Sequence, residues 1–479
     1  MSSYTISPKL KSNRVFILQK SELEKRLDPK FYANDYKENL AKIKYNNYKR
    51  LGEIVKFSSE TWNQKDFFEN TFPYIEISEI DTLSGEIQNI TQVDKSEAAS
   101  RAKMVVREND IIISTTRPNR GAIALIKKEQ DFSIASTGFS VIRNITNPDI
   151  DRQYLFAILR QQIILKQFEQ RSSGGNYPAI TQEELSNVII PFANKEKQTS
   201  VVKIFNNCFA EKQKNEAEAE KLLSSIDDYL LNELGITLPT PSENTLRNRM
   251  FYSSLRQLSG NRLDPFFYNV SFNKLVDRIH KGKFKVDKLG SVCSNIDTGN
   301  TPSKSTYVES DEENILPIIK AGSYTGNFID IDKSDFVKSD FSGNTVSKGD
   351  IFILGAAHQA EYVGKKVYYL NEVPKQKTFF VGELVRITAN PNKCDNSFLF
   401  SILKTKLYMD LLNREKRGQT SHLYPKDVKH IFIPIPPLDK QQEIANHITD
   451  IRQQAQQLKD KTKELLKTAS EEIEKILLT

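Results

Sequence analysis

A heptapeptide pattern that occurs twice constrains this chain more than any other feature of its sequence. Arg26–Tyr32 reads RLDPKFY, and half a chain later Arg262–Tyr268 reads RLDPFFY. Self-similarity at this scale is the mark of a duplicated structural unit. The sequence therefore predicts two copies of one module.

Further matches follow in the same order in both halves. The paired segments are Arg14–Phe16 with Arg249–Phe251, Leu51–Val55 with Leu289–Cys293, Asn109–Ile113 with Gly349–Ile353, Tyr154–Arg160 with Phe398–Lys404, Val188–Pro191 with Ile431–Pro434, and Lys197-Gln198 with Lys440-Gln441. Chance would not give so many matches in one order. The stretches between them are unrelated, so we expect a shared frame that carries two different contact surfaces.

Within the first copy, the hydrophobic pattern indicates a mixed α/β domain. Helical spacing of apolar residues covers 33–45 and 150–169. Short runs rich in β-branched and aromatic residues predict strands at 74–77, 111–114, 122–126 and 140–143. No glycine-rich turn joins a strand to a helix, which favours a compact α/β recognition domain.

Each copy ends in a long helix. Residues 196–234 contain no Pro or Gly, and apolar residues recur at alternating three- and four-residue steps there and again after residue 438. Two such stripes in one chain predict an antiparallel coiled coil. Polar Lys212 and Asn215 in the middle of the first stripe should weaken packing and favour one register. The pair either only joins the two domains or, if both bind one extended ligand, acts as a ruler between them.

The predicted fold class is α+β, with two α/β domains in tandem, each followed by a long helix, and pseudo-twofold symmetry. The predicted segments are a first domain at 1–195, a central spacer helix at 196–235, a linker at 236–248, a second domain at 249–437 and a C-terminal spacer helix at 438–479.

Composition leaves the class of ligand open. The net charge of +7 suits a polyanion, but an excess of Lys together with Ile and Asn can also reflect the base composition of the genome. No apolar run approaches the ~20 residues of a membrane span, and the N-terminus lacks a signal-peptide core, so a cytoplasmic protein is expected. Cys208, Cys293 and Cys394 lie far apart and are expected to be reduced and buried.

Signatures of catalysis are absent from the sequence. It contains no Walker loop, no Gly-x-Gly-x-x-Gly and no His-Glu-x-x-His, and its five histidines are not spaced as metal ligands. Asp264–Phe267 is similar to the Asp-Pro-Pro-Tyr/Phe loop of adenine-N6 methyltransferases, but the second proline and a glycine-rich S-adenosylmethionine loop are missing. A structural turn fixed by proline is favoured, and no catalytic residue, cofactor or metal is assigned to this chain.

Polar loops occupy equivalent places in the two copies and are the candidate ligand contacts. Arg, Asn, Gln and His can form paired hydrogen bonds with base edges, Ser, Thr and Lys contact phosphates, and small residues let backbone N–H groups approach a phosphate. Each loop could also be an ordinary surface turn, and Trp62 could be a core anchor. The candidate DNA-binding residues are Trp62, Asn63, Lys65, Arg117, Asn119, Arg120, Ser173, Gly174, Gly175 and Asn176 in the first copy, and Thr298, Asn300, Thr301, Ser303, Lys304, His358, Gln359, Arg417, Gly418, Gln419, Thr420 and Ser421 in the second.

Three motifs of the second copy carry a family resemblance. They are Asp297–Ser303 (DTGNTPS), Gly349–Ile353 (GDIFI) and, above all, Ile433–Gln441 (IPIPPLDKQ) before the C-terminal helix. With them, the chain resembles the specificity subunits of type I restriction–modification systems over nearly its whole length. The first copy departs from the family pattern, since Pro191–Asn194 lacks the double proline and Ser58–Gln64 lacks Thr-Pro-Ser.

The resemblance implies two target recognition domains, each reading one half of a split double-stranded DNA sequence. It also implies that the paired helices set the gap and dock two methyltransferase subunits, which bind S-adenosylmethionine, and that two restriction (translocase) subunits join for cleavage. The chain itself would catalyse nothing. The alternatives are a specificity chain of a type IIB-like or methylation-only system, or a scaffold that binds two protein copies without DNA.

Overall fold

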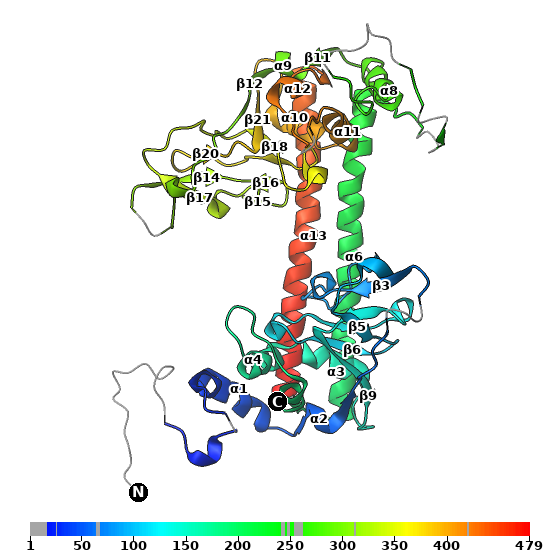
Figure 1. Cartoon of the computed structure of the whole chain (residues 1–479), viewed down its shortest axis with the longest axis vertical. Helices are drawn as coiled ribbons and strands as arrows, with labels where there is room; N and C mark the ends of the chain where they lie inside the picture. Colours follow the sequence, from blue (N-terminus) through cyan, green and yellow to red (C-terminus); the bar gives the residue numbers. More distant parts are fainter. Residues whose placement is uncertain are drawn as a thin grey trace. The chain divides into compact units, whose positions relative to one another are not determined.

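The computed structural model describes residues 17–24, 26–63, 68–240, 245–246, 250–252, 262–310, 313–418 and 421–479. The chain divides into two compact units (Figure 1). Unit 1 comprises Met1–Ala217 and Leu458–Thr479, and unit 2 comprises Glu218–Gln457. The long helices α6 (Lys195–Leu234) and α13 (Leu438–Leu478) each contribute one half to each unit.

Unit 1 is an α/β domain built on two four-stranded sheets and a two-stranded pair. The first sheet has the order β2-β9-β6-β7 (Val55–Phe57, Phe139–Ile145, Ile111–Ser114, Ile123–Leu125), the second the order β4-β3-β8-β5 (Thr91–Asp94, Thr71–Ile75, Ile134–Ser136, Ala102–Val105), and β1 (Tyr48–Arg50) pairs with β10 (Ile189–Pro191). The helices are α1 (Asn34–Lys44), α2 (Leu51–Ile54), α3 (Arg152–Leu159), α4 (Gln162–Arg171) and α5 (Gln182–Ser186).

The core of unit 1 lies between the first sheet and the helices. Every residue of β6 is buried, which its run of three isoleucines requires. One buried cluster joins that sheet to α3, α4 and the beginning of α6, and it includes Ile473 and Leu477 at the end of α13. Burial of a large aliphatic side chain stabilises a fold by about 1.5–3 kcal/mol, so this cluster holds the helix ends to the sheet.

Unit 2 repeats the same arrangement. Its sheets have the order β12-β21-β18-β19-β16-β15 (Cys293–Thr298, Leu384–Ala389, Ile351–Leu354, Val367–Tyr369, Phe328–Ile329, Tyr324–Thr325) and β13-β17-β14-β20 (Tyr307–Val308, Asp335–Lys338, Ile315–Ile319, Phe379–Phe380), and β11 (Val286–Lys288) pairs with β22 (Phe432–Pro434). The helices are α8 (Val270–His280), α9 (Leu289–Val292), α10 (Asn396–Leu403), α11 (Lys406–Arg414) and α12 (Pro425–Val428).

The duplication predicted from the sequence is confirmed in the strand pairing that the two units share. The parallel pair β3·β8 of unit 1 has its counterpart in the parallel pair β14·β20 of unit 2, and both pairs lie in otherwise antiparallel sheets. Asp151 caps α3 through the N–H of Tyr154, and Asp395 caps α10 through the N–H of Phe398. The units differ where β15 and β16 extend the first sheet of unit 2 to six strands, while the matching place in unit 1 holds only the Ile80–Ile87 bridge.

One glutamine joins each long helix to its domain. The Gln198 amide accepts from the N–H of Asp151 at 2.8 Å and donates to the carbonyls of Asp149 and Ala193 at 2.7 and 2.9 Å. The equivalent Gln441 accepts from the Asp395 N–H at 2.8 Å and donates to the Lys393 and Pro436 carbonyls. Both glutamines are buried, which explains why this position matches in the two copies.

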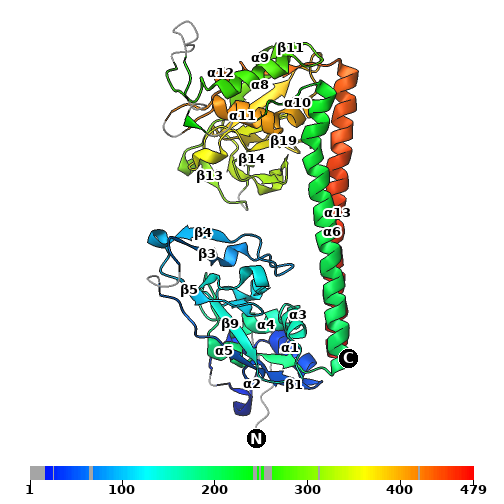
Figure 2. The same cartoon turned by 90° about the vertical axis from the view of Figure 1, so that its right-hand side faces the viewer.

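The long helices run antiparallel within each unit, and they lie side by side in both views (Figures 1 and 2). In unit 2, Lys440 at the start of α13 forms an ion pair with Glu233 near the end of α6, with 2.7 Å between Nζ and Oε2. Ile444 and Ile448 belong to the same buried cluster as Ile226 and Leu230. In unit 1, Asn215 of α6 donates to the Thr462 hydroxyl of α13 at 3.3 Å, and both residues are buried.

The polar middle of α6 has a second contact that the sequence did not reveal. The Lys212 side chain is only 4% exposed, and its ammonium lies 2.6 Å from Glu86 Oε2 and 2.6 Å from Glu216 Oε2. Glu86 belongs to the hairpin after β3, so Lys212 ties the helix to the domain. Burial works against the Lys212 ammonium, yet its hydrogen bonds with Glu216 and Glu86 raise its pKa above the ordinary value.

Some predicted elements differ from the structure. The helix expected at 150–169 is two helices, α3 and α4, because the chain leaves helical geometry at Gln161, whose backbone is extended. Cys208 and Cys394 are free and buried as expected, but Cys293 is half-buried. The Arg14–Phe16 match, Arg249 of its partner and part of the predicted linker lie outside the described residues. Within the described parts of the chain, no helix has the length and apolar character needed to span a membrane.

Candidate nucleic-acid interface

The candidate loops leave the first sheet of each unit at the same edge. In unit 1, β2 and β6 end where β9 begins, since Ser114 pairs with Phe139 and the Ser58 N–H donates to the Val141 carbonyl. In unit 2, β12 and β18 end where β21 begins, with Thr298 paired with Val385 and Leu354 with Leu384. The fold therefore gathers sequence-distant loops at one edge per unit.

A duplicated charge network lies beneath each edge. In unit 1, the Arg143 guanidinium bridges Glu60 and Asp110, with 2.9 Å between NH2 and Asp110 Oδ2. A hydrogen bond from Arg107 lowers the pKa of Glu60. In unit 2, Arg386 bridges Asp297 and Asp350 in the same way.

Arg386 donates from Nε to Asp297 Oδ1 at 2.9 Å and lies 3.6 Å from Asp350 Oδ2. Burial raises the pKa of Asp350, whose side chain is 2% exposed. Asp297 lies in β12, one residue before its end, and Glu60 lies three residues after the end of β2, so the two arginines hold the starts of the candidate loops that follow these strands.

In unit 1, Arg117 joins two candidate loops. Its NH2 donates to the Asn176 carbonyl at 2.8 Å, and its guanidinium lies 4.4 Å from the centre of the Tyr177 ring. Arg117 has a left-handed backbone, with φ of 48°, which turns the chain into a short 3-10 helix. The structure thus brings Arg117 to the loop that contains Ser173–Asn176.

Part of the backbone of the loop after α4 already forms hydrogen bonds within the protein. The N–H of Ser173 donates to the Ala179 carbonyl at 2.8 Å, so this amide is not available to a phosphate. Gly174 has φ of +107°, a conformation that favours glycine, and no atom lies within 4 Å of a side chain built at Gly175. Gly174, Gly175 and Asn176 remain the candidates at this loop.

Four predicted contacts of unit 1 are buried, lie away from Arg117 or fall outside the described residues. Trp62 as a DNA contact is wrong, because the indole is 5% exposed, packs against Phe72 and donates to the Ala102 carbonyl at 2.7 Å. Asn119 and Arg120 do not join the Arg117 group. They line a groove of about 620 Å³ beside α4 and α13. Asn63 is exposed, and Lys65 lies outside the described residues.

In unit 2, the loop after β12 is held by its own polar side chains. The Thr301 hydroxyl donates to Glu383 Oε2 and accepts from the Gly382 N–H, each at 3.0 Å. Asn300 accepts from the Asn344 N–H at 3.1 Å, and Asn344 donates to the Thr298 carbonyl at 2.8 Å. These contacts make Thr301 and Asn300 supports of the loop.

Gly299 explains the close packing of this loop. A side-chain carbon there would lie 1.9 Å from the Phe380 carbonyl oxygen, so no other residue fits without displacement. Ser303 bonds locally with Ser305 and Thr306, and Lys304 is exposed beside them.

Some of the remaining candidate residues of unit 2 are exposed, and others already form ion pairs or hydrogen bonds within the protein. His358 and Gln359 are exposed in the loop after β18. Arg417 forms an ion pair with the buried Asp427. The backbone N–H of Arg417 donates to the His422 carbonyl, and the backbone N–H of His422 donates to the Arg417 carbonyl, each at 2.7 Å. The Ser421 N–H donates to the Gly418 carbonyl, Gly418 is exposed, and Gln419 and Thr420 lie outside the described residues.

Two aromatic residues at these loops were missed from the sequence. Tyr177 is 70% exposed beside Arg117, and Tyr424, 43% exposed, stacks on His422 with 5.9 Å between ring centres. An aromatic residue that closes a glycine-containing loop was the available signal. Exposed aromatic faces next to basic side chains can stack on bases or sugars.

In the part of the chain that the structure describes, no group of three or more His, Cys, Asp or Glu side chains is placed to hold a metal ion. The Asp residues of the duplicated heptapeptide form ion pairs, Asp28 with Arg26 and Asp264 with Arg262, each at 2.9 Å.

Comparison with known proteins identifies the family. The sequence signature described as the type I restriction modification DNA specificity domain matches residues 43–221 and 281–468. The type I restriction enzyme HindI specificity subunit of Haemophilus influenzae is 27% identical over a matched region that covers 30% of this chain and only 28% of that relative. The putative type I restriction enzyme MjaX specificity subunit of Methanocaldococcus jannaschii is 23% identical, over 84% of this chain and 86% of the relative.

Among solved structures, a chain from a study of the complex assembly and conformational transition of the type I R-M system is 24% identical with a TM-score of 0.49, covering 90% of this chain and 97% of that one. The HsdS subunit from Thermoanaerobacter tengcongensis is 24% identical with a TM-score of 0.34, covering 90% and 95%. The family signature falls once on each half of the duplication and covers more than half of the sequence. The chain belongs to the type I restriction–modification DNA specificity family, as a specificity subunit with two recognition domains.

Proposed function

We propose that the two recognition domains read the two halves of one split DNA target through the loops at their equivalent sheet edges. The observation that carries this proposal is the contrast between frame and loops. The core strands, the Arg143 and Arg386 charge networks and the helix joints match, while the loops that they support differ in sequence. A protein that reads two unlike half-sites with one frame needs this combination.

The proposed contacts follow from the side chains that the loops leave accessible. In unit 1 they are Asn63, Arg117, Asn176 and the backbone at Gly174 and Gly175. In unit 2 they are Lys304, His358, Gln359 and Gly418, together with Ser303. Arginine, asparagine, glutamine and histidine suit base edges, and lysine and backbone N–H groups suit phosphates.

The chain is proposed to contribute recognition and assembly only. Two methyltransferase subunits would dock on the paired helices and supply both S-adenosylmethionine binding and adenine methylation, and two restriction subunits would join for cleavage. The site of action would be the cytoplasm, where the DNA lies. The helices would set the gap between the half-sites.

The test is to co-express the chain with its candidate methyltransferase and to map methylated adenines across genomic DNA. The expected motif has two short specific halves separated by unspecified bases. His358→Ala should relax base preference in one half only, whereas the matched control His430→Ala, also exposed in unit 2, should leave the motif unchanged. A single contiguous motif, or methylation by this chain alone, would contradict the proposal.

Two alternatives make different predictions. A type IIB-like or methylation-only system would give the same motif but different partners, so affinity purification of the complex separates it from a type I assembly. A scaffold without DNA contact would show no salt-dependent DNA binding. Contact with 6–10 phosphates should instead lower affinity about 10³–10⁵-fold between 50 and 200 mM salt.

A further inference from the structure

The strongest sequence repeat, the heptapeptide of Arg26–Tyr32 and Arg262–Tyr268, is not part of the proposed contact loops. We refer to each copy as the RLDP turn. In both units it is closed by the same two bonds. Arg26 donates to Asp28 from Nε and NH2 at 2.9 and 3.0 Å, and the Tyr32 hydroxyl donates to the Arg26 carbonyl at 2.8 Å.

The RLDP turn of unit 2 repeats this geometry. Arg262 Nε donates to Asp264 Oδ2 at 2.9 Å, and the Tyr268 hydroxyl donates to the Arg262 carbonyl at 3.0 Å. The proline of unit 1, Pro29, occupies the first position of a 3-10 turn. Each RLDP turn therefore holds its arginine in one orientation.

That arginine reaches the C-terminal end of a helix in both units. Arg26 NH1 donates to the carbonyl of Arg171, the last residue of α4, at 3.2 Å. Arg262 donates to the carbonyls of Arg414, Glu415 and Lys416, at the end of α11, at 3.3, 3.2 and 2.7 Å. Carbonyls at a helix C-terminus lack partners within the helix and carry partial negative charge, so a guanidinium is a strong cap there.

An aromatic ring completes the contact in both copies. The Arg26 and Arg171 guanidinium groups lie 4.7 and 5.4 Å from the centre of the Phe31 ring. In unit 2, Arg262 and Arg414 lie 4.1 and 4.4 Å from the Phe267 ring. The residues that precede Arg171 and its equivalent Glu415 also match, because Gln170 and Arg414 donate to the carbonyls of Phe31 and Phe267.

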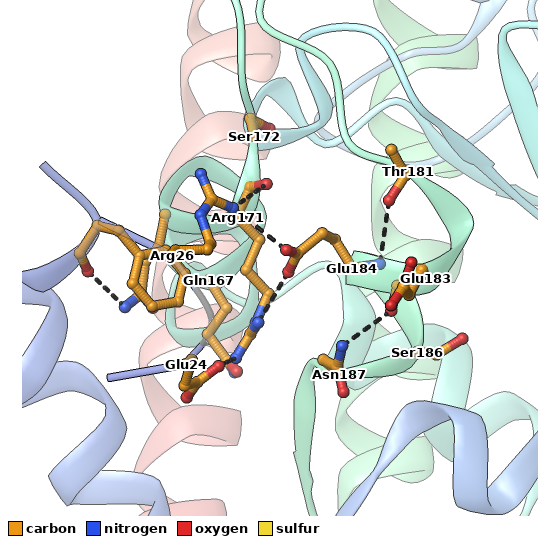
Figure 3. Close-up of polar contacts among 12 residues, drawn as sticks. Glu24, Arg26, Gln167, Arg171, Ser172, Thr181, Glu183, Glu184, Ser186 and Asn187 are labelled. Atoms are coloured by element: carbon orange, nitrogen blue, oxygen red, sulfur yellow. Dashed lines mark hydrogen bonds and ion pairs between the residues drawn. The ribbon is translucent and has the colours of Figure 1, made fainter. Parts of the chain in front are cut away.

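The helix end that the arginine caps is the root of a candidate DNA loop. In unit 1 that loop runs from Ser172 to Thr181, between α4 and α5. Arg171, before the loop, forms an ion pair with Glu184, just after it, with 2.9 Å between NH1 and Oε2, and Arg26 contacts the same carboxylate at 3.3 Å. Figure 3 shows Glu184 between the arginines and Thr181, whose hydroxyl caps α5.

Unit 2 closes its loop root with different ion pairs, because only the acidic residue after the loop is kept. The position of Arg171 holds Glu415, which lies 3.8 Å from Arg262, and the position of Glu184 holds Asp427, which pairs with Arg417 at the start of the loop. The capping arginine is retained although its neighbours change. The shared element is therefore the arginine on the helix end, and the neighbouring pairs vary with the loop.

We propose that Arg26 and Arg262 are positioning residues that fix the roots of the loops after α4 and α11 and thereby set where those loops meet DNA. The inference rests on the proposed function for the DNA contact, and it assigns no direct DNA contact to either arginine. Their side chains are 18% and 4% exposed and already engaged with carbonyls and carboxylates. Each acts on the half-site read by its own unit.

The test uses Arg26→Lys, Arg26→Met and the equivalent Arg262 variants in complex with the methyltransferase, with adenine methylation mapped as for the wild type. Lysine keeps the charge but loses the planar fork that reaches a carbonyl and a carboxylate together. Each variant should reduce discrimination between wild-type targets and targets mismatched in one half about tenfold, which is the scale of a single base contact. Methionine should have the larger effect.

The two units serve as controls for each other. Arg26 variants should change base preference in one half and Arg262 variants in the other, while Arg278→Met, at an exposed arginine of α8, should change neither. Equal loss of methylation at every target with unchanged base preference would mean that the arginines only stabilise the fold, and it would overturn the inference. Unchanged methylation in the Met variants would overturn it as well.

A readout without DNA separates failure of this inference from failure of the proposed function. Hydrogen exchange of the full chain should be at least tenfold faster at 172–181 in Arg26→Met than in wild type, with the 58–63 segment unchanged. If wild type gives no split motif but this exchange pattern appears, the proposed function fails and loop positioning stands. If exchange at 172–181 is unchanged, the positioning role is wrong.

Discussion

Replacing Gln198 or Gln441 with leucine should loosen the joint between a long helix and its recognition domain. Leucine has a similar volume but no polar atoms. In unit 1 the substitution leaves the Asp151 N–H without its acceptor and removes the donor from the Asp149 and Ala193 carbonyls. Gln198 is 2% exposed, so water does not replace these bonds without displacement of the helix.

The magnitude follows from the groups left without partners. An unsatisfied buried donor or acceptor costs about 1–3 kcal/mol, and the N–H is the costliest of the three because a carbonyl tolerates the loss of one bond better. We expect a loss of about 3 kcal/mol in the free energy of local opening at the start of α6. This corresponds to a rise of about a hundredfold in the opening equilibrium.

Hydrogen–deuterium exchange with mass spectrometry measures this directly, because it resolves peptides of the two units in one experiment. Gln198→Leu should accelerate exchange at the starts of α3 and α6, and Gln441→Leu at the starts of α10 and α13. Gln453→Leu, at an exposed position of α13, is the matched control. If each joint variant exchanges like this control, the buried glutamines do not hold the helices and the reasoning is refuted.

Three further predictions concern single residues. Lys212→Met should lower the free energy of unfolding of unit 1 by about 2 kcal/mol in urea, less than the loss of a fully buried ion pair, because Glu216 is half exposed. Adding Glu86→Gln to this variant should restore part of the lost stability. If the effects of the two substitutions simply add, Lys212 and Glu86 are not coupled and the prediction is contradicted. Burial raises the pKa of Glu415 to about 7, so its ionisation destabilises the fold as pH rises from 4.5 to 7. Glu415→Gln should therefore stabilise α11 by about 2 kcal/mol at pH 8 and not at pH 4.5. The measurement is hydrogen exchange, corrected for the pH dependence of the intrinsic exchange rate. An equal gain in stability at the two pH values would refute the prediction. Gly299→Ala should abolish wild-type base preference in one half of the methylation motif, whereas Gly322→Ala, with open space around it, should be silent; a silent Gly299→Ala would show that the loop after β12 is not used.

The sequence predicted the frame because the frame is local and repeated. The stretch at 111–114 is a strand with three successive isoleucines buried on both faces, and the Gln198 and Gln441 matches mark an actual joint. The break between α3 and α4 was not predictable from hydrophobic spacing, because apolar residues continue through it. It depends on Gln161, whose amide donates to the Ala157 carbonyl and accepts from Ser470 of α13, a contact between residues far apart in sequence.

The site was predictable as loops but not as individual side chains. Only the structure distinguishes polar residues of the same type. Arg117 donates to the Asn176 carbonyl, whereas Arg120, three residues later, lines the groove beside α4 and α13. Trp62 was placed wrongly because composition does not reveal that the loop after β2 turns inward onto Phe72. The Lys212 contact with Glu86 was likewise hidden, since nothing in a helix pattern identifies a carboxylate on another element.

Site-specific crosslinking to the mapped target tests the central claim, that each unit reads its own half-site. A photoreactive amino acid would replace Asn63 in unit 1 or Lys304 in unit 2, both exposed in candidate loops. The account predicts that the Asn63 position crosslinks to one specific half of the target and the Lys304 position to the other, with neither reaching the unspecified bases between them. Crosslinks from both positions to the same half, or to the gap alone, would contradict it.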